Sequence, residues 1–314
     1  MKKLYLVVPC YNEEQVLPFS SKILKEKMEQ LMADDRISKD SRILFVNDGS
    51  TDATLSILDT LHQTEDLFSY ISLSKNRGHQ NALLAGLMYA REHCDIVISL
   101  DADLQDDINA IDEMIEKNAQ GCEIVLGVRD KRETDTLFKR MTAETFYHFQ
   151  HFLGIDTVYN HADYRLMSTK ALASLSEFQE VNLYLRGIIP LLGYKTDVVY
   201  YARNKREYGE SKYPLRKMLS FALDGITSFT VRPIRFILLL GFLIFGVAIF
   251  ALIYSLIQNW HHNVVPGWTS LFFSIWAIGG IQMIAIGLIG EYIGKIYSET
   301  KHRPKYIVEI IKDK

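Results

Sequence analysis

Short apolar runs alternate with stretches of helical periodicity along the first 130 residues of the chain. Each run is apolar throughout rather than at every second position, which is typical of strands buried on both faces of a sheet. This alternation predicts an α/β domain with an open, mostly parallel sheet covered by helices. Asn12 and Gln15 suit the N-cap and the third position of the first helix. The predicted strands are Leu4–Val8, Ile43–Val46, Tyr70–Leu73, Ile96–Leu100 and Ile124–Leu126, and the predicted helices span about 13–32, 52–63, 79–92 and 108–119.

The middle of the chain has a different pattern. From about 134 to 175 it is helical and rich in aromatic residues, and a strand-like run follows at Val198–Tyr201. A polar loop, Arg203–Tyr213, separates this strand from a segment at 214–231 with apolar residues at helical spacing. Basic residues beside that segment favour a helix that lies in a membrane interface, with packing against the domain as the alternative.

Two stretches without any charged residue follow, at Phe236–Ile257 and Thr269–Gly290. Each contains 22 residues, enough for a helix to cross a hydrocarbon core of roughly 30 Å. The connecting segment, Gln258–Trp268, has no Lys or Arg, whereas both outer flanks are basic. The positive-inside rule therefore predicts a multi-pass protein of the inner (plasma) membrane with its N-terminal domain and both termini in the cytoplasm. Small residues in the spans would permit a homo-oligomer.

The distribution of charged residues divides the chain into the same two parts, a body and a C-terminal segment. Residues 231–314 carry eight Lys/Arg and four Asp/Glu, a net charge of +4, so the remaining residues contribute −7 to the total of −3. Three cysteines without metal-site spacing favour a reduced compartment, and we expect no signal peptide and no nucleic-acid partner. The predicted divisions are a catalytic domain at 1–213, an amphipathic helix at 214–232, a membrane hairpin at 233–292 and a basic tail at 293–314.

The acidic segment after the fourth predicted strand is the strongest chemical signal. Asp101 and Asp103 are two residues apart, so on an extended backbone their carboxylates point the same way. Such a pair of hard oxygen ligands suits Mg²⁺ or Mn²⁺ bound to the phosphates of a nucleotide. The alternative is an acidic turn in which Asp106 or Asp107 caps the next helix.

Two other predicted strands also end in polar residues. Asp48 can accept hydrogen bonds from a base or ribose, and Gly49 permits close approach. The first strand ends in Pro9–Glu14, so three strand ends present polar side chains at the edge where open α/β sheets place ligands. The histidines match no metal-ligand spacing and are interpreted mostly as surface or packing residues: His79, His148, His151 and His161.

Six segments in order resemble the inverting glycosyltransferases of family 2. With the C-terminal hairpin, the whole chain is similar to the polyprenyl-phosphate group of that family, which includes bactoprenol glucosyltransferases and dolichol-phosphate-mannose synthases. The resemblance implies a GT-A-like fold. It is carried by Pro9–Glu14, Asn47–Asp52, Ser74–Ala82, Asp101–Asp106, Ala162–Met167 and Arg206–Tyr213.

The resemblance also implies a role for particular residues. Asp103 would be the direct metal ligand, with Asp101 beside it near the ribose. Asp163 matches the position proposed as catalytic base, although a buried ion pair with Arg165 is the alternative. Residues implied to bind the nucleotide are Pro9, Tyr11, Glu13, Asp48, Arg77, Gly78, Asp101 and Ala102, and those implied to bind the phosphates are Arg165, Arg206, Ser211 and Lys212.

These inferences predict an inverting transfer of a sugar from a nucleotide-sugar, most simply a UDP-hexose, to polyprenyl phosphate. A phosphate monoester has a second pKa near ~6 and is already a nucleophile at neutral pH, so Asp163 would orient groups more than remove a proton. The alternatives are a GDP-mannose-dependent polyprenyl-phosphate mannose synthase and a membrane protein that binds nucleotide-sugar without turnover.

Overall fold

The computed structural model describes residues 1–129, 161–180, 185–202 and 268–314, with single positions at 237, 241, 243 and 250. The chain divides into two compact units. The first is formed by Met1–His148, Asp156–Tyr213 and Arg303–Lys314, and the second by Phe149–Ile155 and Pro214–His302.

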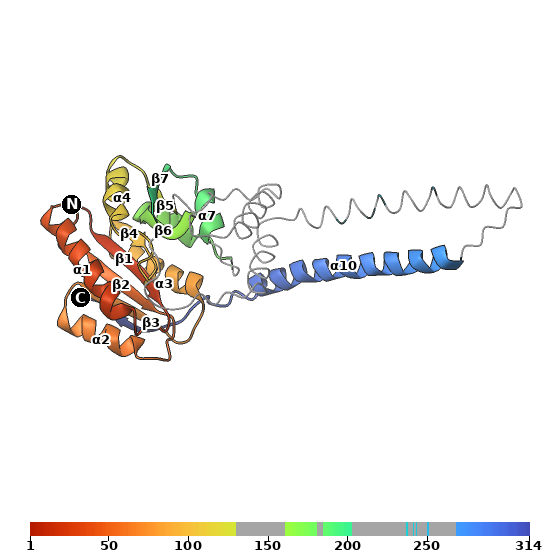
Figure 1. Cartoon of the computed structure of the whole chain (residues 1–314), viewed down its shortest axis with the longest axis horizontal. Coiled ribbons are helices and arrows are strands. Elements are labelled where there is room, and N and C mark those ends of the chain that lie inside the picture. The colour runs from red at the N-terminus through yellow and green to blue at the C-terminus, as the bar shows by residue number, and fades with distance from the viewer. Residues whose placement is uncertain are drawn as a thin grey trace, which may run out of the picture. The chain divides into compact units, whose positions relative to one another are not determined.

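One mixed sheet organises the first unit (Figure 1). Its eight strands have the order β7-β5-β6-β4-β1-β2-β3-β8. The strands β3, β2, β1 and β4 are parallel, whereas β6 is antiparallel to both β4 and β5, and β8 is antiparallel to β3. The strands are β1 Leu4–Cys10, β2 Arg42–Asn47, β3 Phe68–Leu73, β4 Ile96–Ser99, β5 Ile124–Arg129, β6 His161–Ser168, β7 Thr196–Tyr201 and β8 Val308–Lys312.

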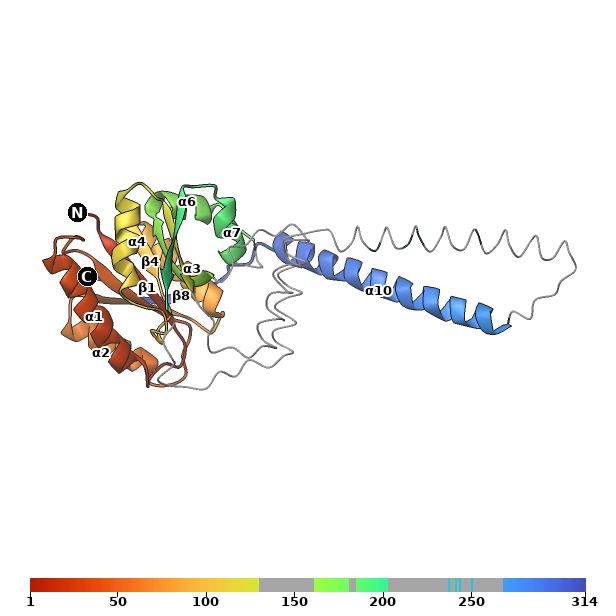
Figure 2. The same ribbon diagram turned by 45° about the horizontal axis from the view of Figure 1, so that its top comes forward.

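Helices cover both faces of this sheet, as Figure 2 shows. The helices α1, α2 and α4 lie on one face, and α3 and α6 on the other. Gly86 allows α3 to approach closely, because a Cβ there would lie 2.4 Å from Val7 Cγ1 and 2.7 Å from Val46 Cγ2. The helices are α1 Leu17–Ala33, α2 Thr54–Thr64, α3 His79–Arg91, α4 Ala110–Ala119, α6 Thr169–Ser176, α7 Leu185–Leu191 and, in the second unit, α10 Trp268–Thr300.

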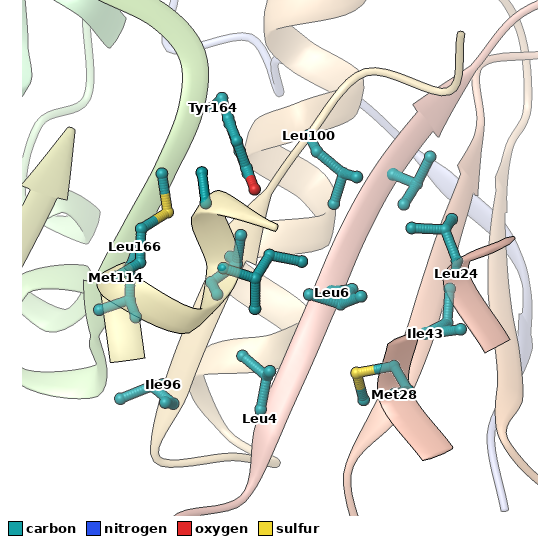
Figure 3. Packing of buried hydrophobic residues seen from close by; sticks show 14 of the residues in the cluster. Leu4, Leu6, Leu24, Met28, Ile43, Ile96, Leu100, Met114, Tyr164 and Leu166 are labelled. Carbon is teal, nitrogen blue, oxygen red and sulfur yellow. The ribbon is translucent and has the colours of Figure 1, made fainter. Parts of the chain in front are cut away.

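The larger apolar core lies between the sheet and the helices α1, α2 and α4 (Figure 3). Leu4 and Leu6 of β1 meet Leu24 and Met28 of α1, and none of these side chains is exposed. Complete burial of such a side chain contributes roughly 1.5–3 kcal/mol. The core therefore makes the sheet a rigid platform for the loops at its edge.

The predicted strands and helices of the first 130 residues are confirmed within a few residues of their predicted ends. The predicted N-cap is wrong, because α1 begins at Leu17 and its N-cap residue is Val16. Asn12 instead has a positive φ of 54° and accepts a hydrogen bond from the Thr51 amide at 2.9 Å. Its side chain thus joins two loops rather than starting a helix.

The prediction of helix from 134 to 175 is wrong at 161–168, which form β6, and is confirmed at 169–175, which lie in α6; residues 134–160 lie outside the described residues. Alternation explains the strand: Tyr164 and Leu166 enter the apolar core, whereas Asp163 and Arg165 point to the opposite face. The sequence carries this alternation from His161 to Leu166, so the strand signal was present there and was interpreted as part of a helix.

The C-terminal residues form a strand that the sequence did not predict. Strand β8 pairs with β3, with Ile311 opposite Ile71. Beyond it, the Asp313 carboxylate accepts hydrogen bonds from Tyr5 Oη at 3.1 Å, from Tyr89 Oη at 2.8 Å and from the Ser69 hydroxyl. Burial opposes ionisation, but the Ser69 and Tyr89 hydrogen bonds outweigh it and lower the pKa of Asp313. These bonds hold the C-terminal residues against β1, β3 and α3.

The structure describes one of the two predicted membrane spans and only single positions of the other. The span at 236–257 lies mostly outside the described residues, and the span at 269–290 lies within α10. Among the residues that are described, no helix combines the length and apolar character that crossing a membrane requires. The multi-pass arrangement therefore stays a prediction.

Replacing Asp313 with Ala is expected to lower the free energy of unfolding by roughly 1–3 kcal/mol, because three hydroxyl groups lose their acceptor. The difference from wild type should be fully present above the ordinary Asp pKa of about 3.9 and should shrink as the pH falls through the lowered pKa. Thermal unfolding followed by circular dichroism, from neutral pH down to roughly pH 2, below the ordinary Asp pKa of about 3.9, measures this difference.

The control is Asp66→Ala, which removes the exposed ion pair with Lys314 at 2.7 Å. Solvent screens that pair, so its loss should change stability much less. Equal melting temperatures for Asp313→Ala and Asp66→Ala would show that the buried cluster does not fasten the tail.

Candidate functional site

Polar residues from four strands meet at one edge of the sheet. The parallel strands β1, β2 and β4 end there, followed by Tyr11, Asp48 and Asp101. Strand β6 runs in the opposite direction, and Ser99 of β4 pairs with Arg165, so Asp163 lies just beyond the end of β4. The antiparallel strand therefore brings a residue from far along the chain to the edge predicted for ligands.

Asp48 is fixed by the loop that follows β3. Its carboxylate accepts hydrogen bonds from the backbone amides of Arg77 at 2.7 Å and Gly78 at 2.9 Å. Its side chain is buried, which raises the pKa, although these two bonds act in the opposite direction. Gly49 has a φ of +62°, and a Cβ there would lie 2.5 Å from the Lys75 carbonyl carbon. The close approach predicted at Gly49 is confirmed.

The loops after β1 and β2 are joined by reciprocal hydrogen bonds. The Asn12 amide donates to Ser50 Oγ at 3.0 Å, and the Glu13 amide donates to Thr54 Oγ1 at 2.9 Å. The Ala53 amide in turn donates to a Glu14 carboxylate oxygen at 3.0 Å. These bonds give this edge of the sheet a defined shape.

The acidic loop after β4 is anchored at its far end. Asp106 is buried and accepts hydrogen bonds from Arg129 Nε at 3.1 Å, Arg129 Nη2 at 3.0 Å and Tyr201 Oη at 2.8 Å. Leu104 has a φ of +48°, so the loop turns sharply after Asp103. The residue assigned as N-cap of α4 is Asn109, so Asp106 does not cap this helix. The Asp107 carboxylate accepts a hydrogen bond from the Asn109 amide at 2.9 Å in the turn that leads into α4. The capping alternative is therefore wrong for Asp106, whereas Asp107 does bind the start of the helix.

Asp163 lies in a cluster of cationic side chains. It forms an ion pair with the fully buried Arg165, and it accepts bonds from Arg186 Nη2 at 3.0 Å and Arg186 Nε at 3.3 Å. His79 Nε2 lies 3.6 Å from both Asp163 Oδ2 and Asp101 Oδ1. Burial alone would raise the pKa of Asp163, but the Arg165 charge and the bonds from His79 and Arg186 hold it well below its usual range.

A proton acceptor needs a pKa near the working pH, and Asp163 does not have one. Its geometry instead suits a counter-ion that fixes cations. The predicted ion pair with Arg165 is confirmed. Arg165 is fully buried and paired with Asp163, so its guanidinium is not accessible to a phosphate.

The acidic pair could hold a divalent cation only with help from a ligand. Asp101 keeps 38% of its side chain exposed, and Asp103 is partly exposed in the same loop. Among the described residues, no group of three or more His, Cys, Asp or Glu side chains is arranged to hold a metal ion. Mg²⁺ and Mn²⁺ commonly take one or two carboxylates and complete their shell with phosphate and water, so this donor set fits them.

Most of the other predicted residues lie at the same edge. Pro9 is buried in β1, Ala102 is buried in the loop after β4, Glu13 is partly buried, and Tyr11 is 44% exposed. The predicted phosphate-binding residues of the polar loop lie outside the described residues: Arg206, Ser211 and Lys212.

Two residues of the Asp163 cluster were missed from the sequence. His79 was interpreted as a surface or packing residue, although it begins α3 at the site. Arg186 was not selected at all, yet it is the one charged residue between Asn182 and Gly193. A lone charge in an apolar segment needs a partner when it is buried, and this signal could have identified it.

Comparisons with known proteins agree with this arrangement. A model of glycosyl transferase family 2 matches residues 5–175, and a model of the GtrB C-terminal hairpin matches residues 232–296. The chain is 50% identical to an uncharacterized glycosyltransferase, YkoT, of Bacillus subtilis over 98% of this chain and 91% of that protein. It is 40% identical to a prophage bactoprenol glucosyl transferase homolog of Escherichia coli, over 99% of each chain. It is also 40% identical to the bactoprenol glucosyl transferase of Shigella phage SfV, over 99% of this chain and 100% of the phage protein.

The mixed α/β sheet with its acidic edge and the match over more than half of the chain lead to the same assignment. This chain belongs to glycosyltransferase family 2, and it is a glycosyltransferase.

Proposed function

We propose that the protein transfers a hexose, with inversion, from a UDP-sugar to polyprenyl phosphate at the cytoplasmic face of the membrane. The observation that carries the proposal is the similarity to bactoprenol glucosyl transferases, which extends from end to end of both chains. The product would be a lipid-linked sugar for modification of a cell-envelope glycan.

The order of the strands supports this reaction. Asp48 follows β2, the Asp101–Asp103 pair follows β4, and Asp163 lies on β6 next to β4. A nucleotide-sugar can extend along this edge with its base and ribose near Asp48 and its diphosphate near Asp101. The anomeric carbon would then face the Asp163 cluster, where an acceptor phosphate could approach in line.

Asp103, with Asp101 beside it, would hold Mg²⁺ or Mn²⁺. When bound, the metal would neutralise charge on the departing nucleotide diphosphate. Residues of the chain would hold the donor diphosphate and the acceptor phosphate close together. The backbone amides of Arg77 and Gly78 fix Asp48, and Arg129 fixes the acidic loop through Asp106.

Asp163 acts in this proposal by orienting cations rather than by removing a proton. A polyprenyl phosphate is largely dianionic above its second pKa of about 6, so its oxygen needs no general base. The Arg165 and Arg186 bonds that lower the pKa of Asp163 are consistent with a permanently ionised carboxylate.

A membrane location supports the use of a lipid acceptor. The proposed hairpin spans 236–257 and 269–290, which lack charged residues, and the match to the GtrB C-terminal hairpin covers both. The connecting loop would face away from the cytoplasm, so the catalytic unit would lie on the side where nucleotide-sugars are made.

The proposal is tested with the detergent-purified full-length protein, undecaprenyl phosphate and a panel of radiolabelled nucleotide-sugars that includes UDP-glucose and GDP-mannose. We expect a lipid-linked product from a UDP-hexose with wild type, and loss of roughly 10²-fold or more in rate for Asp103→Ala, since charge stabilisation in the transition state is worth several kcal/mol. EDTA should abolish the wild-type reaction, and added Mn²⁺ or Mg²⁺ should restore it.

The matched control is Asp107→Asn, in the same loop, which keeps an acceptor for the Asn109 amide that Asp107 binds at 2.9 Å. It should retain activity. Transfer from GDP-mannose alone would favour a mannose synthase, and undiminished transfer by Asp103→Ala in EDTA would exclude the metal role.

Replacing Asp163 with Asn should lower kcat far more than it weakens UDP-sugar binding, by roughly 10²-fold against less than threefold, because orientation of the acceptor is lost. The acid limb of the pH profile should stay near pH 6 in both proteins, since we assign it to the second ionisation of the acceptor phosphate, at about 6. Steady-state kinetics and calorimetric binding of the UDP-sugar measure the two effects.

A thermal melt of Asp163→Asn must accompany these measurements, because removal of one partner of a buried ion pair costs about 3–5 kcal/mol. If the variant bound UDP-sugar poorly but turned over normally, Asp163 would belong to the nucleotide site. Disappearance of the acid limb in the variant would instead identify Asp163 as a general base.

A short epitope inserted between Gln258 and Trp268 should be accessible to antibody from outside the cytoplasmic membrane in spheroplasts. The same epitope after Lys314 should be accessible only after permeabilisation. Protection of the loop epitope in intact spheroplasts would contradict the proposed hairpin topology.

A further inference from the structure

We propose that the C-terminal segment Ile307–Asp313 positions the loop Ser74–Gly78 and thereby sets the affinity of the site for the nucleotide of the donor. The inference rests on the proposed function, because it concerns the donor site of that reaction. Its basis is the pairing of β3 with β8, a bulge in that pairing at Glu309 and the hydrogen bonds that fix both ends of the segment.

The loop Ser74–Gly78 connects β3 to α3 at the edge of the sheet where the site lies. Its last two amides, those of Arg77 and Gly78, donate to the Asp48 carboxylate at 2.7 Å and 2.9 Å. The base and ribose of the donor are proposed to bind beside Asp48. A displacement of this loop would therefore change the shape of the nucleotide site directly.

The C-terminal segment holds the backbone that leads into this loop. The pairs that β3 forms with β2 end at Ser72. On the other side of β3, the pairing with β8 continues to Leu73, which lies opposite Val308. Beyond that pair, the Ser74 amide donates a hydrogen bond to the Ile307 carbonyl at 3.0 Å. The two residues that follow Ser72 are therefore held from the β8 side.

A bulge in β8 sets the direction of this contact. Ile310 lies opposite Ser72 and Val308 lies opposite Leu73, so Glu309 is an extra residue on the β8 side of the ladder. Bulges bend a strand and increase its local twist, and they are frequent beside active sites. The Glu309 side chain is exposed, so the bulge can be removed without disturbing a buried group.

The other end of the segment is fixed to the core of the first unit. The Asp313 carboxylate accepts hydrogen bonds from Tyr5 of β1, Ser69 of β3 and Tyr89 of α3. Helix α3 begins directly after the loop. The segment therefore holds the backbone before the loop, at Ser74, and the helix that follows the loop, at Tyr89.

The first test deletes Glu309 in the detergent-purified full-length protein. The same backbone pairs stay possible, but the strand loses its bend, and Val308 and Ile307 turn to the opposite face of the sheet. We expect the Kd for UDP, measured by calorimetry with Mn²⁺ present, to rise roughly 5- to 30-fold, as when one or two hydrogen bonds that fix a binding loop are lost. The KM for the UDP-sugar should rise in parallel while kcat changes less than about twofold.

Two substitutions accompany the deletion. Glu309→Ala keeps the bulge and changes only an exposed side chain, and Asp66→Ala removes an exposed ion pair with Lys314, outside the segment. Both should bind UDP within about twofold of wild type, as is typical of surface substitutions. An unchanged Kd in the deletion variant would overturn the inference. An equal loss of affinity in Glu309→Ala would also overturn it, because the side chain and not the bulge would then be responsible.

A second measurement uses wild type and does not depend on the folding of a variant. Hydrogen–deuterium exchange, read by mass spectrometry, reports how readily each segment opens. If the docked segment favours UDP binding, UDP must favour the docked segment by the same factor. UDP with Mn²⁺ should therefore slow exchange in peptides that cover 303–314 as well as 70–80, and should leave the C-terminal half of α1 unchanged. Protection of 70–80 alone would contradict the coupling.

The outcomes also separate this inference from the proposed function. Wild type that binds UDP and transfers sugar, with an unchanged Kd in the deletion variant and no protection of 303–314, would refute only the role of the C-terminal segment. Wild type that neither binds UDP nor transfers sugar from a UDP-sugar would refute both.

Discussion

The site depends on one buried carboxylate. Asp163 is almost fully buried, and so is Arg165, its neighbour two residues along β6. Taking both charges out of water is costly, and a buried pair is tolerated only when its geometry and hydrogen bonds are good. Asp163 meets this condition by binding side chains from three different elements. The same bonds therefore stabilise the fold locally and fix the arrangement of β6, α3 and α7 at the edge of the sheet.

The charge of the side chains along this edge of the sheet changes between β2 and β6. The loops after β2 and β4 present carboxylates and backbone amides, which suit a ribose and a metal-bound diphosphate. The cluster on β6 is cationic. A reaction between two phosphate-bearing molecules needs this gradient, because it lets both anions enter without repelling each other across the scissile bond. Although residues 1–230 carry a net charge of −7, the Asp163 cluster places two arginines beside one carboxylate.

The sequence predicted the features that depend on local pattern. Continuous apolar runs located the parallel strands, and Asp48, Asp101 and Asp103 followed from their place at strand ends. The strands β6 and β8 were missed because each is defined by pairing with a distant segment. In β6 the polar and apolar residues do alternate, but this short pattern follows a long stretch interpreted as helix, and β8 has only five residues. Arg186 and His79 were missed for a related reason, since only the tertiary fold brings them to Asp163.

Strand β8 has a further consequence for handling the protein. It covers the edge of β3, whose backbone amides and carbonyls would otherwise be unpaired. An open edge strand with apolar side chains such as Ile71 is a template for pairing with another chain. A protein shortened before Val308 would therefore tend to associate edge to edge and precipitate. Strand β8 thus replaces this edge with a five-residue edge strand that carries Glu309 and Lys312, although it lies more than two hundred positions from the strand it covers.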